Sequence, residues 1–328
     1  MTERPTGVLV MAHGTPGTPE EIESFYTSIR RGRPPTPELL ADLVGRYQAI
    51  GGTSPLRQHT EAQVQGLAAT LEAAAPGRFV VRYGAKHTEP SIEAGMAELA
   101  QAGVARVVGL VLTPHQSAAG TGQYLDRAAR AASSVTPPIE LLPVPSWFRT
   151  PGFASILAQR VQDSLASLPE AVRADAEVIF TAHSVPSRAV HENDPYPEEV
   201  TESAKDIAAL AGLGHWRVAW QSAGRTADVW LGPDLLDEIR TIAAEGTAAV
   251  VVCPVGFVAD HLEVLFDLDI EAAAVAASVG IGFARTASLN DDPRFLTVLA
   301  EAVLAEAVLA DAVSAAASSD RGAKSPAP

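Results

Sequence analysis

The densest group of side chains with metal-binding potential lies in residues 260–271. This segment reads Asp-His-Leu-Glu-Val-Leu-Phe-Asp-Leu-Asp-Ile-Glu and holds five carboxylates and no lysine or arginine. If the segment is helical, Glu263, Asp267 and Glu271 form one stripe along its surface. Like charges at this spacing destabilise an isolated helix, and a solvated helix face would interleave lysines. Carboxylate oxygens in a row, close to imidazoles, suit a hydrated divalent cation in transit better than a closed structural site.

A second concentration of charge has the opposite sign. Between Arg30 and Arg57 there are five arginines, at positions 30, 31, 33, 46 and 57, against two carboxylates. The guanidinium group is suited to bidentate recognition of carboxylate or phosphate. The alternative is a solvated helix face with ordinary ion pairs, each of which contributes little. Because several of these arginines lack acidic neighbours in sequence, we predict that the segment contacts a small anionic ligand.

Three histidines lie just beyond apolar runs that are typical of buried strands. These histidines are His13, His115 and His183, and the runs that precede them are residues 7–12, 107–112 and 177–180. A fourth such run covers residues 248–252. Open α/β sheets bind ligands beyond the carboxyl ends of their strands, so the histidines indicate a cleft there. The alternative is that each imidazole caps a loop by hydrogen bonding.

The elements that position these groups follow an alternating pattern. Helical patterns separate the apolar runs, namely residues 89–102, 153–168, 198–211 and 233–245. Strands that alternate with helices predict an α/β fold with parallel sheets, and the alternation occurs twice, which predicts two similar lobes. We place the lobes at residues 1–147 and 148–311, and the last helix of the second lobe is expected to be able to pack on the first.

Two segments depart from this alternation. Residues 23–56 are an arginine-rich insertion after the first strand, in the position expected of a flap that contacts a ligand. Residues 312–328 are rich in Ala and Ser and end in Lys-Ser-Pro-Ala-Pro. We expect this tail to be disordered.

Composition excludes several classes of protein. Hydrophobic residues make up 47% of the 328 residues and aromatic residues 5%, and the formal net charge is −15. This charge disfavours nucleic acid and anionic membranes as general partners. The single cysteine, Cys253, follows an apolar run and is expected to be an inert buried thiol, with no disulfide or thiolate metal site. We find no signal sequence and no integral membrane segment, so we expect a cytoplasmic protein.

Several longer motifs resemble one known family. They occur in the order Tyr26–Arg33, Arg46–Gly52, Thr181–Pro186, Asp194–Tyr196, Trp220–Ser222, Trp230–Pro233 and Pro254–Glu263. Together they resemble ferrochelatase over about residues 7 to 310. The resemblance is strongest to the soluble type found in Gram-positive bacteria, which acts on coproporphyrin III. It implies two Rossmann-like lobes with the active-site cleft between them.

The resemblance also implies an activity, which is the insertion of ferrous iron into a porphyrin. His183 corresponds to the imidazole at the metal-insertion face and Glu263 to its carboxylate partner. Metal insertion releases two pyrrole protons, and an imidazole beside a carboxylate can accept protons or hold the metal. Asp267 and Glu271 correspond to an outer path that brings the metal to Glu263. Which of His183 and Glu263 binds iron first, and which takes the proton, stays open.

Coproporphyrin carries four propionates, which gives the arginine-rich insertion a ligand. The resemblance assigns substrate binding to His13, Arg30, Arg46, Tyr47, Ser54 and Tyr124. His13 stands where many relatives have a tyrosine that ligates the product iron, and imidazole is also a good haem ligand. We therefore expect His13 to be the axial ligand of the product. The lone cysteine predicts that no [2Fe–2S] cluster and no permanent cofactor are bound.

Three alternatives stay open at this point. The chain could be a ferrochelatase for protoporphyrin IX, a cobalt or nickel chelatase for a related tetrapyrrole, or a haem carrier without activity. A carrier has no need of the acidic stripe, which argues against it. The expected partners are coproporphyrin III and ferrous iron, and we expect a monomer that makes transient contact with neighbouring haem-pathway enzymes.

Overall fold

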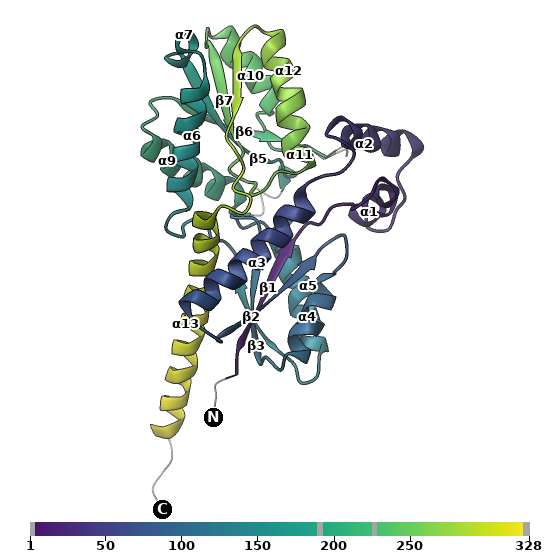
Figure 1. Cartoon of the computed structure of the whole chain (residues 1–328), viewed down its shortest axis with the longest axis vertical. Coiled ribbons are helices and arrows are strands. Elements are labelled where there is room, and N and C mark those ends of the chain that lie inside the picture. The colour runs from purple at the N-terminus through teal and green to yellow at the C-terminus, as the bar shows by residue number, and fades with distance from the viewer. Residues whose placement is uncertain (1–3, 189–192, 225–227, 324–328) are drawn as a thin grey trace, which may run out of the picture.

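The computed structural model describes residues 4–188, 193–224 and 228–323. It contains two four-stranded parallel sheets, each flanked by helices (Figure 1), which confirms the predicted α/β class and its two lobes. The strands are β1 (Thr6–Ala12), β2 (Phe79–Ala85), β3 (Arg106–Val111), β4 (Glu140–Val144), β5 (Ala176–His183), β6 (Trp216–Gln221), β7 (Ala249–Cys253) and β8 (Gly282–Arg285).

The two sheets have the same strand order. The first is β2-β1-β3-β4 and the second is β6-β5-β7-β8, and every pairing is parallel. The four apolar runs of the sequence are the middle strands β1, β3, β5 and β7. Strands β1 and β7 are buried at every residue, whereas β8 is only half-buried throughout. Since helices cover both faces of a parallel sheet, its middle strands are the most apolar.

Helices pack on these sheets and connect their strands. Their bounds are α1 (Ile22–Ile29), α2 (Pro37–Ala49), α3 (Leu56–Ala74), α4 (Ile92–Gln101), α5 (Thr121–Ser134), α6 (Phe153–Ser167), α7 (Glu170–Arg173), α9 (Tyr196–Ala211), α10 (Leu235–Ala244), α11 (Leu262–Leu265), α12 (Ala273–Ser278) and α13 (Pro293–Ala323). A short 3₁₀ turn covers Pro19–Glu21 and a π-helical turn covers Asp267–Ala272. Within the described ranges, no helix has both the length and the apolar character needed to cross a bilayer.

The last helix, α13, starts at the second lobe and runs along the first beside α3 (Figure 1). Asp311 on α13 forms ion pairs with Arg78 and Arg106 of the first lobe. We expected disorder from residue 312, but α13 continues to Ala323. That expectation is wrong for residues 312–323, because runs of alanine favour a helix once it has started. Residues 324–328 lie outside the described residues.

The insertion at residues 23–56 forms most of α1 and all of α2, which project from the first lobe at the height of α11 of the second (Figure 1). It does not stay in its own lobe. Ile22 and Tyr47 form an apolar cluster with Leu262, and Phe266 packs against that cluster. The insertion therefore contacts the segment of the second lobe that carries the acidic residues.

Candidate active site

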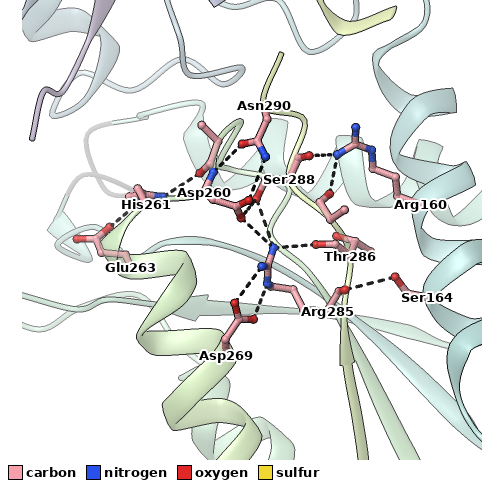
Figure 2. A network of polar contacts seen from close by, with 12 residues as sticks. Arg160, Ser164, Asp260, His261, Glu263, Asp269, Arg285, Thr286, Ser288 and Asn290 are labelled. Atoms are coloured by element: carbon pink, nitrogen blue, oxygen red, sulfur yellow. Dashed lines mark hydrogen bonds and ion pairs between the residues drawn. The ribbon is translucent and has the colours of Figure 1, made fainter. Parts of the chain in front are cut away.

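Glu263 lies between two imidazoles at the carboxyl end of the second sheet. Its Oε1 is 3.6 Å from Nε2 of His183, which is the last residue of β5, and its Oε2 is 3.7 Å from Nε2 of His261 (Figure 2 for His261). In both histidines Nδ1 faces a backbone carbonyl, 2.6 Å from Ser184 and 3.0 Å from Ala259. Because a carbonyl oxygen only accepts, Nδ1 carries a proton and Nε2 is directed at the carboxylate.

Buried neighbours fix this arrangement. The side-chain amide of Gln221 donates to the backbone oxygen of Glu263 at 3.1 Å, and its carbonyl accepts from Thr181 at 2.7 Å. Thr181 and Gln221 lie near the carboxyl ends of the adjacent strands β5 and β6. Gly256 passes so close that a Cβ there would lie 2.6 Å from Cβ of Ala182. A side chain at Gly256 would thus push on the strand end that carries His183.

The two groups hold each other in their charged forms. Burial by itself would lower the pKa of His183, but the charge of Glu263 and its hydrogen bond raise it above the usual value. Burial by itself would raise the pKa of Glu263, but His183 and then His261 lower it well below the usual value. At neutral pH the pair is an imidazolium and a carboxylate.

His13 occupies the corresponding position in the first lobe, directly after β1. Its ring centroid lies 4.7 Å from that of His87 and 5.7 Å from that of Phe25. The ring keeps contact with solvent, yet the surrounding protein withdraws enough water to lower its pKa, against the opposing charge of Glu263. Nδ1 is 3.2 Å from the Gly14 carbonyl, so the lone pair is on Nε2. His13 is therefore a neutral imidazole whose Nε2 carries the lone pair.

The glycine after His13 is required by its conformation. Gly14 has φ of +84° and lies so close to Thr88 that a Cβ would collide with its hydroxyl. A left-handed backbone and a close approach both favour glycine.

The acidic residues beyond Glu263 contact the flap. Arg46 of α2 forms an ion pair with Asp267, lies 3.9 Å from a carboxylate oxygen of Glu271, and stacks 4.6 Å from the centroid of Phe266. Ser222 also hydrogen-bonds to Asp267. Burial and the charge of Glu263 raise the pKa of Asp267 to about 6, although Arg46 opposes this.

These acids do not form the regular α-helical stripe that the sequence suggested. Glu263 lies on α11, whereas Asp267 and Glu271 lie in the π-helical turn, where the amide of Glu271 donates to the Phe266 carbonyl at 3.0 Å. Such turns are rare and occur frequently at functional sites.

The remaining residues expected to bind substrate have different surroundings. Within the described part of the chain, Nε of Arg30 is buried without a hydrogen-bond partner. The hydroxyl of Tyr47 lies 3.3 Å from that of Thr15, and Ser54 accepts from a backbone amide of α3. The ammonium group of Lys86 lies 4.8 Å from the ring centroid of Tyr124.

A cavity of about 550 Å³ opens between the lobes. Arg31 and Gln123 of the first lobe line it, and so do Arg188 and Asp194 of the second. Its volume is within the range of about 300–1,000 Å³ that small-molecule sites occupy. Its lining adjoins the site, since Gln123 is next to Tyr124 and hydrogen-bonds to Lys86 at 2.9 Å.

His115, the third strand-end histidine, is not part of the site. It is almost fully buried, its Nε2 is 2.7 Å from Ser203 on α9, and burial lowers its pKa to about 3. Because Ser203 belongs to the second lobe, this contact of His115 joins the two lobes.

Comparison with known proteins identifies the family. A model of the family described as ferrochelatase matches residues 5–307. The chain belongs to the ferrochelatase family. Similar curated relatives are "Coproporphyrin III ferrochelatase" of Bacillus subtilis, 44% identical over 92% of this chain and 98% of that one, and "Ferrochelatase" of Herpetosiphon aurantiacus, 41% identical over 91% and 98%.

Solved structures show the same fold at low identity. SirB from Bacillus subtilis with Fe³⁺ aligns with a TM-score of 0.60 and 12% identity, over 94% of this chain and 98% of that one. A second SirB structure, described as a sirohydrochlorin chelatase in complex with cobalt, aligns with a TM-score of 0.55 and 14% identity, over 92% and 95%. The ferrochelatase family member described here thus shares the chelatase fold.

Several residues that shape this ferrochelatase site were not predicted from the sequence. His261 and Gln221 both contact Glu263, and Ser222 contacts Asp267. All three lie within motifs that resemble ferrochelatase, but the sequence alone assigned no role to them. Lys86 follows β2, an edge strand that was not predicted. Cys253 is a free, buried thiol, and burial raises its pKa to about 12, as expected for an inert residue.

Proposed function

We propose that this enzyme inserts Fe²⁺ into coproporphyrin III and releases coprohaem and two protons. The observation that carries the proposal is the carboxylate of Glu263, held between two imidazoles at a strand end and followed by further acids. Relatives at 41–44% identity named coproporphyrin III ferrochelatase support the choice of porphyrin.

His183 and Glu263 supply both functions that metal insertion needs. The approach of a divalent cation raises the cost of holding a proton on His183, so the imidazolium loses it and its Nε2 becomes a ligand. A pyrrole proton can then return to the same pair, because Glu263 is an acceptor whose second oxygen also faces His261. Two pyrrole protons leave as one Fe²⁺ enters, so charge is balanced.

Asp267 and Glu271 form the outer part of the metal path in this proposal. Carboxylate oxygens suit a hydrated divalent cation, and both lie beyond Glu263 along the same segment. In the described part of the chain, no three His, Cys, Asp or Glu side chains form a ready-made metal centre. Iron is here a substrate that leaves within the product.

The porphyrin carboxylates require cations on the other side of the site. Arg30 offers a buried N–H without a partner in the described residues, and Arg31 and Arg188 line the cavity. Burial lowers the pKa of Lys86 to about 8, and a nearby propionate would favour its charged form. Arg46 pairs with Asp267 through Nη2, and its other N–H groups would be the donors for a propionate. On the opposite face, Nε2 of His13 is available as the axial ligand of product iron.

Anaerobic turnover tests this function directly. The enzyme is incubated with Fe²⁺ and either coproporphyrin III or protoporphyrin IX, and insertion is followed by absorbance. We expect faster turnover of coproporphyrin III; faster turnover of protoporphyrin IX would overturn the choice of substrate. Parallel reactions with Co²⁺ and Ni²⁺ test the other chelatase activity, and haem binding without any turnover would favour a carrier.

The proposal also includes a monomeric enzyme that contacts neighbouring haem-pathway enzymes transiently. Light scattering of the isolated protein measures the first of these properties.

A further inference from the structure

Arg285, the last residue of β8, connects two carboxylates that lie on either side of Glu263 in sequence (Figure 2). Its Nη1 is 3.2 Å from a carboxylate oxygen of Asp260. Its Nε and Nη2 bind both oxygens of Asp269, at 2.7 and 3.0 Å. Asp260 comes just before His261, and Asp269 lies in the π-helical turn. One guanidinium therefore holds both ends of the segment that carries the catalytic carboxylate.

The Asp260 end of this connection is fixed by several further contacts. Its carboxylate accepts from Ser288 at 2.7 Å and from the side-chain amide of Asn290 at 3.0 Å. Its backbone amide donates to the side chain of Asn290 at 2.9 Å. Asn290 has φ of +44°, a conformation that asparagine tolerates better than most residues. Its backbone oxygen accepts from Gln63 of the first lobe at 2.8 Å.

The five acids of the segment have different cationic partners. Asp260 and Asp269 face Arg285, whereas Glu263 faces two imidazoles and the remaining acids, Asp267 and Glu271, face Arg46. The Arg285 side chain is 14% exposed, so its ion pairs are screened less than surface pairs. Loss of its charge would leave two unpaired carboxylates beside the metal path.

We propose that Arg285 is a positioning residue for iron insertion. Its rigid fork fixes the segment so that Glu263 stays between His183 and His261, and it keeps Asp260 and Asp269 from competing for the cation. This inference rests on the proposed role of Glu263 and deepens it. The readout is the kinetics with Fe²⁺, because among the described residues the ion pairs of Arg285 go to Asp260 and Asp269, and neither residue lines the 550 Å³ cavity.

A matched control exists on the opposite edge of the same sheet. Arg217, on β6, also binds several carboxylates, namely Glu177, Glu238 and Glu245. It lies near the amino end of its strand, away from the site. Arg217→Gln thus removes an arginine that pairs with several acids from the same sheet without touching the acidic segment.

The test compares full-length variants in anaerobic steady-state assays, with thermal unfolding as a measure of folding. We expect Arg285→Gln to lower kcat/KM for Fe²⁺ at least about tenfold, since small misplacements at a reacting centre are costly, and to leave KM for coproporphyrin III within about twofold. Arg285→Lys should not restore the iron kinetics, because one ammonium cannot replace the bidentate fork. Arg217→Gln should lower Tm and leave both KM values unchanged.

Three outcomes would overturn the inference. The first is wild-type kcat/KM for Fe²⁺ in Arg285→Lys. The second is that Arg285→Gln changes KM for Fe²⁺ and KM for coproporphyrin III equally. The third is that Arg285→Gln loses no more kcat/KM for Fe²⁺ than Arg217→Gln does. If Arg285→Gln does not fold, Asp269→Asn decides, because Asp269 is 37% exposed and its change leaves the Arg285–Asp260 pair in place. Asp269→Asn should lower kcat/KM for Fe²⁺, and an unchanged value would contradict the inference.

Glu263→Gln, measured in the same assay, separates the proposed role of Glu263 from that of Arg285. Wild-type turnover by Glu263→Gln would refute the proposed role of Glu263 itself. Loss of turnover in Glu263→Gln with normal iron kinetics in Arg285→Gln would refute the positioning role alone.

Discussion

The two lobes share a sheet topology but give their strand-end histidines different protonation states. His13 follows β1 and His183 ends β5, and these strands occupy the same place in their sheets. Beside His13 stand His87 and Lys86, and burial dominates its pKa, which is lowered. Beside His183 stands Glu263, which raises its pKa. The fold thus places the imidazoles, and their neighbours decide which one carries a proton.

The lobes also differ in the charge of their added segments. The arginine-rich flap belongs to the first lobe and the acidic segment to the second, and the two meet where Arg46 pairs with Asp267. A net charge of −15 disfavours an anionic partner for the molecule as a whole. The segregation of arginines from acids allows one site to accept both a tetra-anionic porphyrin and a dication.

The largest effect expected from this difference is on turnover. Glu263→Ala removes the carboxylate that, in the proposed mechanism, accepts a proton and helps to hold the metal. We expect iron insertion to fall by at least about 100-fold, which is in the range of general acid–base contributions. Porphyrin affinity, measured by fluorescence titration, should change little. Turnover near the wild-type rate would show that Glu263 has no such role.

The predicted protonation states of His183 and His13 can be tested independently of turnover. In the wild type, NMR titration of the imidazoles should find His183 protonated and His13 neutral at pH 7. Glu263→Gln removes the charge that raises the pKa of His183, so burial then dominates and the pKa should fall by more than about one unit. His183 would consequently lose its proton at lower pH. The His183 signal is assigned as the one that is missing in His183→Ala. An unchanged pKa for this signal in Glu263→Gln would show that Glu263 does not raise the pKa of His183.

A smaller effect is expected at the contact between the flap and the acidic segment. Arg46 pairs with Asp267 and would compete with a cation on the proposed metal path, so Arg46→Gln should lower KM for Fe²⁺ about three- to fivefold, equivalent to roughly 1 kcal/mol. Arg33→Gln, which changes an exposed arginine of the same insertion, is the control. A raised KM for Fe²⁺, or the same change in both variants, would show that Arg46 does not restrict the path.

The smallest effect on rate is expected at His13. His13→Ala should leave iron insertion within about threefold of the wild type but change the absorption and EPR spectra of the coprohaem complex, because a nitrogen ligand is lost. An unchanged spectrum would remove His13 from the axial position.

How far the sequence predicts the fold depends on burial. The middle strands are continuous apolar runs, so all four were recognised, whereas the edge strands were not. β4 contains Pro143 and an exposed Glu140, and β8 has four residues, none of them fully buried. An edge strand pairs on one side only and tolerates proline and polar residues, so its pattern is weak. Strand order and the reach of α13 depend on tertiary packing that local patterns do not encode.

The candidate site was predictable where its residues follow a strand end closely in sequence. His183 and Glu263 were expected together, and the structure brings them within 3.6 Å. The pairing of Arg46 with Asp267 joins residues 221 positions apart through a flap that folds onto the other lobe. The role of Arg285 depends on β8, which was not predicted. Composition therefore located the charges, but only the fold determined which of them pair.

Single-turnover kinetics of His183→Ala and His13→Ala, measured side by side, test the asymmetry between the lobes most directly. Each variant is mixed anaerobically with coproporphyrin III and Fe²⁺, and coprohaem formation is followed by absorbance. We expect His13→Ala to form coprohaem at nearly the wild-type rate and His183→Ala to form essentially none. A greater loss in His13→Ala than in His183→Ala would contradict this expectation.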